Sequence, residues 1–345
     1  MIAAATWPRG RPEAERLLWI DASADRFSDR RVGDLPSLLR PGDMLVVNDA
    51  ATVPASLRAL RGDGTPFEVR LLSSDGDGST RWRAVLFGRG DWRQRTEDRP
   101  PPPRLLPGEP IRLAGGAGAH VVSIDPRSPR LVSIQFDAGV ASMWRAIYDE
   151  GRPVQYAYVD APLPLWHVQS SFAARPWAVE APSAGRPLTF AVLDGLRRRG
   201  IRTGAITHAA GLSSTGDPAL DAILPLDERY DLPASTVQAV ERTRIEGGRV
   251  VAVGTTVVRA LEGCAAVHDG ALVAGEGSTD LRLGAHSRLR VVGGLLTGIH
   301  ERGTSHFELT RAFAGDALLA RALRHAEMSG YLQHEFGDSV LILPT

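Results

Sequence analysis

The sequence predicts an α/β fold in which a small antiparallel β-barrel-like domain is inserted into a larger α/β domain. Between residues 56 and 140, short stretches alternate apolar and polar residues, a pattern typical of antiparallel strands. On both sides of this region, strand-like and helix-like segments follow one another, as in α/β proteins. A chain of 345 residues is long enough to form two domains. We therefore expect residues 1–55 and 141–345 to form the larger domain, with most of the active site in the second part, and residues 56–140 to form the inserted domain.

The inserted region carries the clearest alternation. It predicts strands over residues 67–72, 82–87, 120–124 and 131–136. The Asp-Gly-Asp-Gly stretch at 75–78 predicts a turn between the first two strands. Four consecutive prolines at 100–103 cannot donate to a ladder, so they predict a stiff, extended loop.

Helical and strand signals alternate in the rest of the chain. The periodicity predicts helices over residues 142–150, 189–199, 234–246 and 318–328. It predicts strands over residues 201–207, 250–253 and 340–343.

The junction around Gly254 is the most informative stretch. Apolar residues 250–253 predict a strand covered on both faces, Gly254 permits a tight turn, and a helix is expected to follow. The first free N–H groups of that helix, with the Thr255 and Thr256 hydroxyls, can hold an anion or a nucleotide hydroxyl. Arg259 is expected on the same helical face. The alternative is that the threonines cap the helix and Arg259 pairs with Glu262 on a solvated face.

Composition sets the remaining limits. The charges of forty basic and forty acidic residues cancel, so the chain lacks the net positive charge typical of nucleic-acid-binding proteins. A local cluster of basic residues is compatible with this balance. The single cysteine, Cys264, cannot form an internal disulfide and is expected to be small and buried. Neither a signal peptide nor an apolar run of ~18 residues is evident, so a soluble cytoplasmic protein is expected, without membrane contact. His306, His325 and His334 form no zinc motif, and no metal is expected.

Residues 253–262, Val-Gly-Thr-Thr-Val-Val-Arg-Ala-Leu-Glu, resemble a signature of the S-adenosylmethionine:tRNA ribosyltransferase-isomerase family of queuosine biosynthesis. Further segments resemble that family in its own order, at residues 34–43, 45–49, 53–55, 169–173, 178–185, 279–280, 294–300, 312–315 and 337–338. The resemblance covers most of the chain. It also implies the arrangement of an inserted β-domain in a larger domain.

The resemblance implies an enzyme that uses S-adenosylmethionine as a co-substrate. The family reaction moves the ribosyl unit to a 7-aminomethyl-7-deazaguanine in tRNA, gives epoxyqueuosine, and releases adenine and methionine. Such chemistry needs a base near the acidified ribose carbon. Our candidates for acid and base groups are Glu228, His300 and Asp280, with His208 and Asp49 also considered. We expect Glu228 and His300 to converge on the ligand.

The S-adenosylmethionine site is expected to draw on several matched motifs. The candidate binding residues are Gly254, Thr255, Thr256, Arg259, Gln169, Phe172, Pro182, Ser183, Ala184, Gly185 and Tyr230. Arg259 is expected to hold the carboxylate of the ligand through two charge-assisted hydrogen bonds. Phe172 and Tyr230 offer aromatic faces for the sulfonium or the adenine.

Departures from the family pattern leave alternatives open. Pro187 and Leu226 stand where the family has histidine, and Ala51 stands where it has arginine. Transfer to tRNA is our first interpretation, and a different, small-molecule acceptor is the second. A catalytically silent S-adenosylmethionine- or RNA-binding paralogue is a third interpretation. A nucleotide-dependent oxidoreductase is a fourth, but the junction lacks the Gly-x-Gly-x-x-Gly motif. The oligomeric state is left open.

Overall fold

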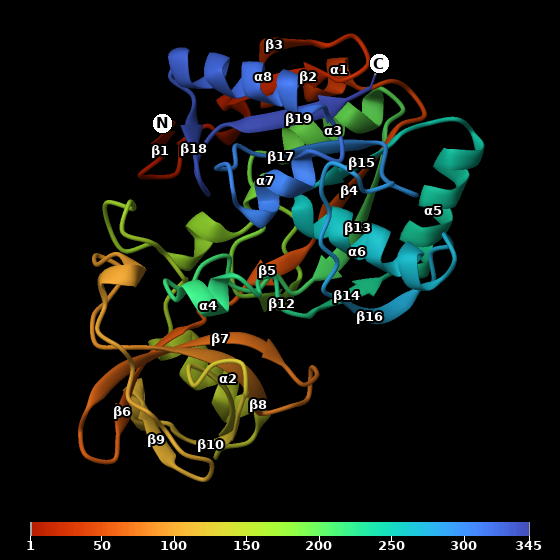
Figure 1. The fold of residues 1–345 in the computed structure, drawn as a ribbon. Helices are drawn as coiled ribbons and strands as arrows, with labels where there is room; N and C mark the ends of the chain where they lie inside the picture. The colour runs from red at the N-terminus through yellow and green to blue at the C-terminus, as the bar shows by residue number, and fades with distance from the viewer. Residues whose placement is uncertain (1, 345) are drawn as a thin grey trace.

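The computed structural model describes residues 2–344, which form a large mixed sheet flanked by helices and a separate closed barrel (Figure 1). The strand order of the sheet is β16-β14-β13-β4-β15-β17-β19-β2-β3. The four central strands, β13, β4, β15 and β17, run parallel. Their bounds and those of the outer strands are β2 Arg16–Asp21, β3 Arg26–Arg31, β4 Met44–Asn48, β13 Arg202–His208, β14 Glu228–Leu232, β15 Val250–Val253, β16 Gly275–Thr279, β17 Gly294–Gly298 and β19 Ser339–Leu343.

Helices cover both faces of this sheet. Alternate residues of β15 separate the two layers, because Val250 and Ala252 pack with α5 and α6, whereas Val251 and Val253 pack with α1 and α3. Because helices cover both faces, the sequences of the central strands are continuous runs of apolar residues. The helices are α1 Leu35–Leu38, α2 Val140–Glu150, α3 Phe190–Arg198, α4 Pro218–Asp221, α5 Ala234–Ile245, α6 Thr255–Val267, α7 Ser305–Thr310 and α8 Asp316–Met328.

The barrel closes through antiparallel pairs in the order β10-β11-β8-β7-β6-β9, with β9 returning to pair with β6 in register Ala59 to Leu113. Its strands are β6 Ser56–Arg61, β7 Pro66–Ser74, β8 Arg81–Phe87, β9 Pro110–Leu113, β10 Gly118–Ile124 and β11 Leu131–Phe136. Two short parallel pairs complete the strands, β1 Ala3–Ala4 with β18 Leu332–Gln333 and β5 Ala50–Thr52 with β12 Arg175–Ala178.

The chain enters and leaves the barrel at neighbouring points. Ser56 and Arg152 exchange both backbone hydrogen bonds, each 3.0 Å long. Only glycine fits next to this bridge at position 151, because a Cβ there would lie 2.1 Å from the Pro54 carbonyl oxygen. Helix α2 precedes the bridge, and its Met143 and Ile147 pack in the core of the barrel. The domain limits at 55 and 141 stay predictions, and this packing leads us to propose that the inserted unit extends through α2.

The turn between β7 and β8 also reaches the larger domain. Asp77 accepts hydrogen bonds from Nε1 of Trp177 at 2.9 Å, from Arg175 at 3.2 Å and from Arg229 at 3.1 Å. Both guanidinium groups stack on Trp177, with their central carbons 4.0 Å and 3.7 Å from the ring centroid. The barrel therefore contacts the sheet at a second place, far along the chain from the Ser56–Arg152 bridge.

The predicted fold class is confirmed, with its mixed α/β content and closed antiparallel barrel. Each helix and strand expected from periodicity is present, with ends shifted by a few residues. Residues 75–78 lie between β7 and β8, and 100–103 lie outside the ladders. Within residues 2–344, no helix has the length and apolar character needed to cross a bilayer.

Candidate active site at the carboxyl edge of the sheet

Strand direction gathers polar residues at one edge of the sheet. The parallel strands β4, β13, β15 and β17 all end at this edge, and β14, which runs the opposite way, begins there. The edge therefore holds His208, Glu228, the Gly254 turn and the residues that follow β17. Open α/β sheets bind ligands at the carboxyl ends of their strands.

Glu228 is the best-connected carboxylate at this edge. Its side chain is 7% exposed, and its Oε1 accepts a hydrogen bond of 2.8 Å from the backbone N–H of Gly211. Its Oε2 accepts a hydrogen bond from a guanidinium N–H of Arg259, which is itself 5% exposed. Burial raises the pKa of Glu228, and the charge of Arg259 works against that rise. A buried carboxyl that is more basic than usual suits proton abstraction.

His208 lies beside this pair at the end of β13. Its ring is fully buried, and Nε2 lies 3.5 Å from Oε2 of Glu228. Burial, together with the nearby charge of Arg259, holds the pKa of His208 well below its ordinary value, so the ring is neutral. Among the described residues, neither ring nitrogen finds a hydrogen-bond partner. A buried polar group without a partner is costly, so this position calls for a functional explanation.

The alternative interpretation, an exposed pairing of Arg259 with Glu262, is wrong. Both residues are buried, because α6 packs into the core on nearly all sides. Glu262 accepts hydrogen bonds from the backbone N–H groups of Arg290, Val291 and Val292 instead, at 2.8 to 2.9 Å. The N-cap of α6 is Gly254, at φ 91°, so the interpretation that a threonine side chain caps this helix is wrong as well.

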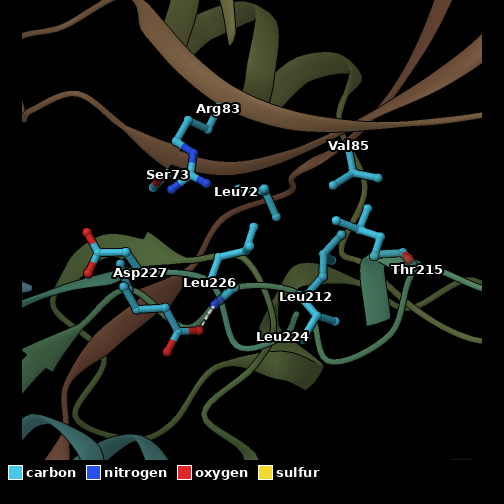
Figure 2. A pocket seen from close by; sticks show the side chains of 13 residues that line it. Leu72, Ser73, Arg83, Val85, Leu212, Thr215, Leu224, Leu226 and Asp227 are labelled. Carbon is cyan, nitrogen blue, oxygen red and sulfur yellow. Dashed lines mark hydrogen bonds between the residues drawn. The ribbon is translucent and has the colours of Figure 1, made fainter. Parts of the chain in front are cut away.

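A cavity of about 420 Å³ opens next to Glu228, between the barrel and the segment that joins β13 to β14 (Figure 2). Both walls supply side chains, and the full lining is Leu72, Ser73, Arg83, Val85, Ala209, Gly211, Leu212, Thr215, Leu220, Leu224, Leu226, Asp227 and Glu228. The interior is mostly apolar, and a buried carboxylate forms part of its wall. This combination is typical of a ligand site.

A second polar group follows β17. Oγ1 of Thr297 lies 2.7 Å from Nε2 of His300, and the His300 and His306 rings meet edge to face at 5.1 Å between centroids. Burial keeps the pKa of His300 well below its ordinary value and lowers the pKa of His306 to about 4, with Arg259 adding to the second shift. Thr297 and His300 line a second, apolar cavity of about 340 Å³. Four strand spacings separate β14 from β17, or ~19 Å, so convergence of Glu228 and His300 on one ligand stays a prediction.

Comparison with known proteins gives the family. A family model described as "Queuosine biosynthesis protein" matches residues 2–342. The chain belongs to this queuosine biosynthesis family. A relative from Thermus thermophilus is 36% identical over 325 residues, which cover 92% of this chain and 89% of the relative. A relative from Acidithiobacillus ferrooxidans is 34% identical and covers 100% of this chain and 95% of its own. Both are named S-adenosylmethionine:tRNA ribosyltransferase-isomerase.

A solved structure supports the fold. The crystal structure of S-adenosylmethionine tRNA ribosyltransferase from Thermotoga maritima matches with a TM-score of 0.52 at 23% identity, over 99% of this chain and 96% of that one. The expected family membership is thus confirmed, and with it the class of the protein as an enzyme, a transferase. The relatives share one name, so the oxidoreductase and the silent paralogue gain no support from them.

Some residues of the queuosine family motifs come together at the Gly254 turn. A Cβ at Gly254 would lie 3.5 Å from both Ala184 Cβ and Thr256 Oγ1, so the segment after Pro182 lies against this turn. Gly185 is in turn covered by the Phe172 ring, whose Cζ would lie 2.8 Å from a Cβ there. Ser183, Ala184 and Gly185 form one 3₁₀ turn. Thr256 is partly exposed, whereas Thr255 is buried.

Other motif residues have local roles or lie elsewhere. The side-chain amide of Gln169 donates to Thr52 O and accepts from Thr52 N, both at 2.9 Å, and so holds β5 in place. Tyr230 is 3% exposed and packs in the core under α6, with its hydroxyl directed at Gly277. Asp280 is exposed just beyond β16, whose last residue, Thr279, pairs with Glu228. The binding or catalytic roles expected for these three residues stay predictions.

Two features of this edge have little signal in the sequence. His208 was considered among the acid and base groups, but its burial beside Glu228 could not be inferred. Arg83 and Asp227 line the cavity from opposite walls, but each is an ordinary polar residue in its own segment. Within residues 2–344, no three histidine, cysteine or acidic side chains are placed to hold a metal ion.

Proposed function

We propose that this protein transfers and isomerises the ribosyl unit of S-adenosylmethionine onto a 7-aminomethyl-7-deazaguanine in tRNA. The product is epoxyqueuosine, with release of adenine and methionine. The observation that carries this proposal is the buried Glu228 carboxylate in the wall of the cavity between the two domains. Membership of the queuosine family supports the substrates, because the relatives are named for S-adenosylmethionine and tRNA.

In this proposal Glu228 is the general base. The sulfonium of S-adenosylmethionine acidifies the adjacent ribose C–H, and the proton passes to a carboxylate oxygen of Glu228. Methionine leaves as the C–S bond breaks. Burial makes this carboxylate a stronger base than an exposed one, while Arg259 keeps it ionised. The Gly211 N–H fixes the orientation of the carboxyl group.

The role expected for Arg259, holding the carboxylate of S-adenosylmethionine, stays a prediction. Its guanidinium donates a hydrogen bond to Glu228, which supports a second role. We propose that Arg259 positions the base and sets its ionisation. The Gly254 turn, with Thr256 and the adjoining segment Pro182 to Gly185, is proposed to hold S-adenosylmethionine, because a helix N-terminus with free N–H groups begins there.

The experiment is a transfer assay with tRNA that carries the deazaguanine amine. The purified protein is incubated with S-adenosylmethionine, with and without this tRNA, and adenine, methionine and the modified nucleoside are measured by mass spectrometry. The proposal expects all three products only when the tRNA is present. Binding of S-adenosylmethionine without any modification of tRNA would overturn it. A cytoplasmic location is part of this proposal.

A further inference from the structure

The cavity beside Glu228 has two walls that belong to different parts of the fold. The barrel supplies Leu72 and Ser73 from β7 and Arg83 and Val85 from β8. The facing wall is the segment from Ala209 to Glu228, which joins β13 to β14. The space between the two walls, about 420 Å³, includes a part that is open to solvent.

Apolar and polar side chains occupy different parts of this cavity. The apolar lining comprises Leu72, Val85, Leu212, Leu220, Leu224 and Leu226. Polar groups lie at one side, where Figure 2 shows the Arg83 guanidinium reaching from the barrel wall toward the side that holds Asp227. A slot with apolar faces and a charged edge suits a flat heterocycle with hydrogen-bonding groups on its rim.

The two charges at this edge have no close partner of opposite charge. Within residues 2–344, neither Arg83 nor Asp227 forms a side-chain hydrogen bond or a direct ion pair, although the charge of Arg83 helps to lower the pKa of Asp125, and the Asp227 residue is exposed. Most charged residues near the domain contact are paired, as Arg175 and Arg229 are with Asp77. An unpaired arginine and an unpaired carboxylate across a cavity are ready to bind a ligand with both acceptors and donors.

The Glu228 and His208 pair lies next to this charged side. Glu228 reaches the cavity wall, and the fully buried His208, 3.5 Å from its Oε2, has both ring nitrogens without a hydrogen-bond partner among the described residues. A ligand in the cavity therefore lies beside the proposed base.

We propose that this cavity receives the target nucleobase of the RNA, turned out of its strand, with the apolar side chains against its faces. This inference rests on the proposed function and adds the place and the recognition of the acceptor. Asp227 accepts from the N–H donors of a guanine-type edge, and Arg83 donates to its carbonyl oxygen. The amine of the base then points toward Glu228. Enzymes that modify a base inside an RNA or DNA strand commonly bind it in such a pocket.

The test uses two variants of the charged edge and one matched control. Arg83→Ala and Asp227→Asn remove one recognition group each. Arg81→Ala changes an arginine of the same strand that pairs with Asp75 and does not line the cavity. Binding of the free base 7-aminomethyl-7-deazaguanine and of S-adenosylmethionine is measured by calorimetry, and the KM for target tRNA by adenine release.

We expect Arg83→Ala and Asp227→Asn each to weaken free-base binding and raise the KM for tRNA by tenfold or more. The affinity for S-adenosylmethionine should stay within twofold of the wild-type value, and Arg81→Ala should match wild type in every measurement. Unchanged free-base affinity in both cavity variants, or equal losses in Arg81→Ala, would overturn the inference. Calorimetry with the free base requires no turnover, so a wild-type protein that binds the base but modifies no tRNA would overturn the proposed function alone.

A second readout reports the position of the base directly. A target RNA hairpin with 2-aminopurine at the modified position should brighten on binding, because the fluorophore leaves its stack. Leu226→Trp fills the slot and should abolish the increase. Its folding is checked by circular dichroism and by S-adenosylmethionine binding. If this variant is misfolded, Val85→Phe replaces it from the opposite wall. Fluorescence that rises equally in a folded, filled variant would contradict the inference.

Discussion

Two buried glutamates, one in each part of the molecule, have opposite electrostatic settings. Glu68, in the barrel, is 5% exposed and lies between Arg70 and Arg99, with a further hydrogen bond of 2.8 Å from Ser56. Burial works to raise its pKa, but the two guanidinium groups overcome burial and lower it. Glu228 is buried to a similar degree and has Arg259 as its guanidinium partner, and its pKa is raised. At similar burial, two guanidinium partners lower the pKa of Glu68, whereas Glu228 has one such partner and the charges of Glu180 and Asp227 nearby, which add to the rise of its pKa.

The largest effect is expected at the glutamate with one arginine. Glu228→Gln keeps the size of the side chain but replaces one of its two acceptor oxygens with an NH2 group, and it cannot accept a proton from carbon. We expect the rate of adenine release by the folded variant to fall by roughly 10²- to 10⁴-fold. The unfolding free energy should fall as well, by up to about 3–5 kcal/mol, because Arg259 stays buried without its carboxylate. Single-turnover kinetics and urea titration measure the two quantities. A rate within tenfold of wild type would show that Glu228 is not the base.

The corresponding change in the barrel should act on stability. Glu68→Ala leaves Arg70 and Arg99 buried without their shared carboxylate, which should cost about 3–5 kcal/mol of unfolding free energy. Urea unfolding measures this loss. The control is Glu109→Ala, which removes a carboxylate from the partly exposed pair with Arg61 and should cost less than about 1 kcal/mol. Equal losses in the two variants would remove the distinction between buried and exposed pairs.

The two glutamates should also differ in the sign of their pH dependence. Relative to an unfolded value near 4.5, the folded pKa of Glu68 is lowered and that of Glu228 is raised. Glu68 therefore contributes stability that is present above pH 4.5 and lost as the pH falls below it. Glu228 instead opposes folding increasingly as the pH rises above 4.5.

The test compares the unfolding free energy of wild type with that of Glu68→Gln and of Glu228→Gln as a function of pH. As the pH rises toward 4.5 from below, the stability of wild type relative to Glu68→Gln should rise, and between pH 4.5 and 7 its stability relative to Glu228→Gln should fall. Glu15 and Glu180, whose pKa values burial raises to about 7, titrate in the same window but are common to all three proteins. Slopes of the same sign for both variants would contradict the comparison.

The smallest effect is expected at the exposed contact between the barrel and the sheet. The Asp77 side chain is 56% exposed, so its pairs with Arg175 and Arg229 are screened by water and salt. Asp77→Asn should lower unfolding free energy by less than about 1 kcal/mol, and 0.5 M salt should shrink the difference. Asp75→Asn, in the same turn, is the control because Asp75 pairs within the barrel with Arg81. A loss as large as that of Glu68→Ala would contradict the role assigned to exposure.

Local patterns in the sequence predicted the helices and strands, but they could not predict which side chains form contacts between them. The change of period at Gly254 correctly predicted β15, the turn and α6, because neighbouring residues set that pattern. The pairing of Arg259 with Glu228 joins residues 31 positions apart in the chain, and the strand order β14-β13-β4-β15 brings them together. Glu262, the partner in the alternative interpretation, was close in sequence and therefore easier to propose.

The cavity could not be predicted from the sequence for the same reason. Its walls come from residues 72–85 and 209–228, which meet only after the barrel has docked against the sheet. Alternation in β8 predicted a strand but could not show that Arg83 faces a second domain. Similarly, the pattern of α2 predicted a helix, and only the packing of Met143 and Ile147 shows which core the helix completes.

The paired strands at Ser56 and Arg152 have a consequence for the ancestry of this protein. Because the two ends of the barrel are hydrogen-bonded to each other, the module occupies a single point in the loop of its host. Units with adjacent ends can be gained, exchanged or excised while the host strands keep their register. The barrel wall of the cavity can therefore be exchanged as a unit, while Glu228, the proposed base, remains on the host sheet. In this proposal, the part of the molecule that evolution can vary is separate from the part that carries the base.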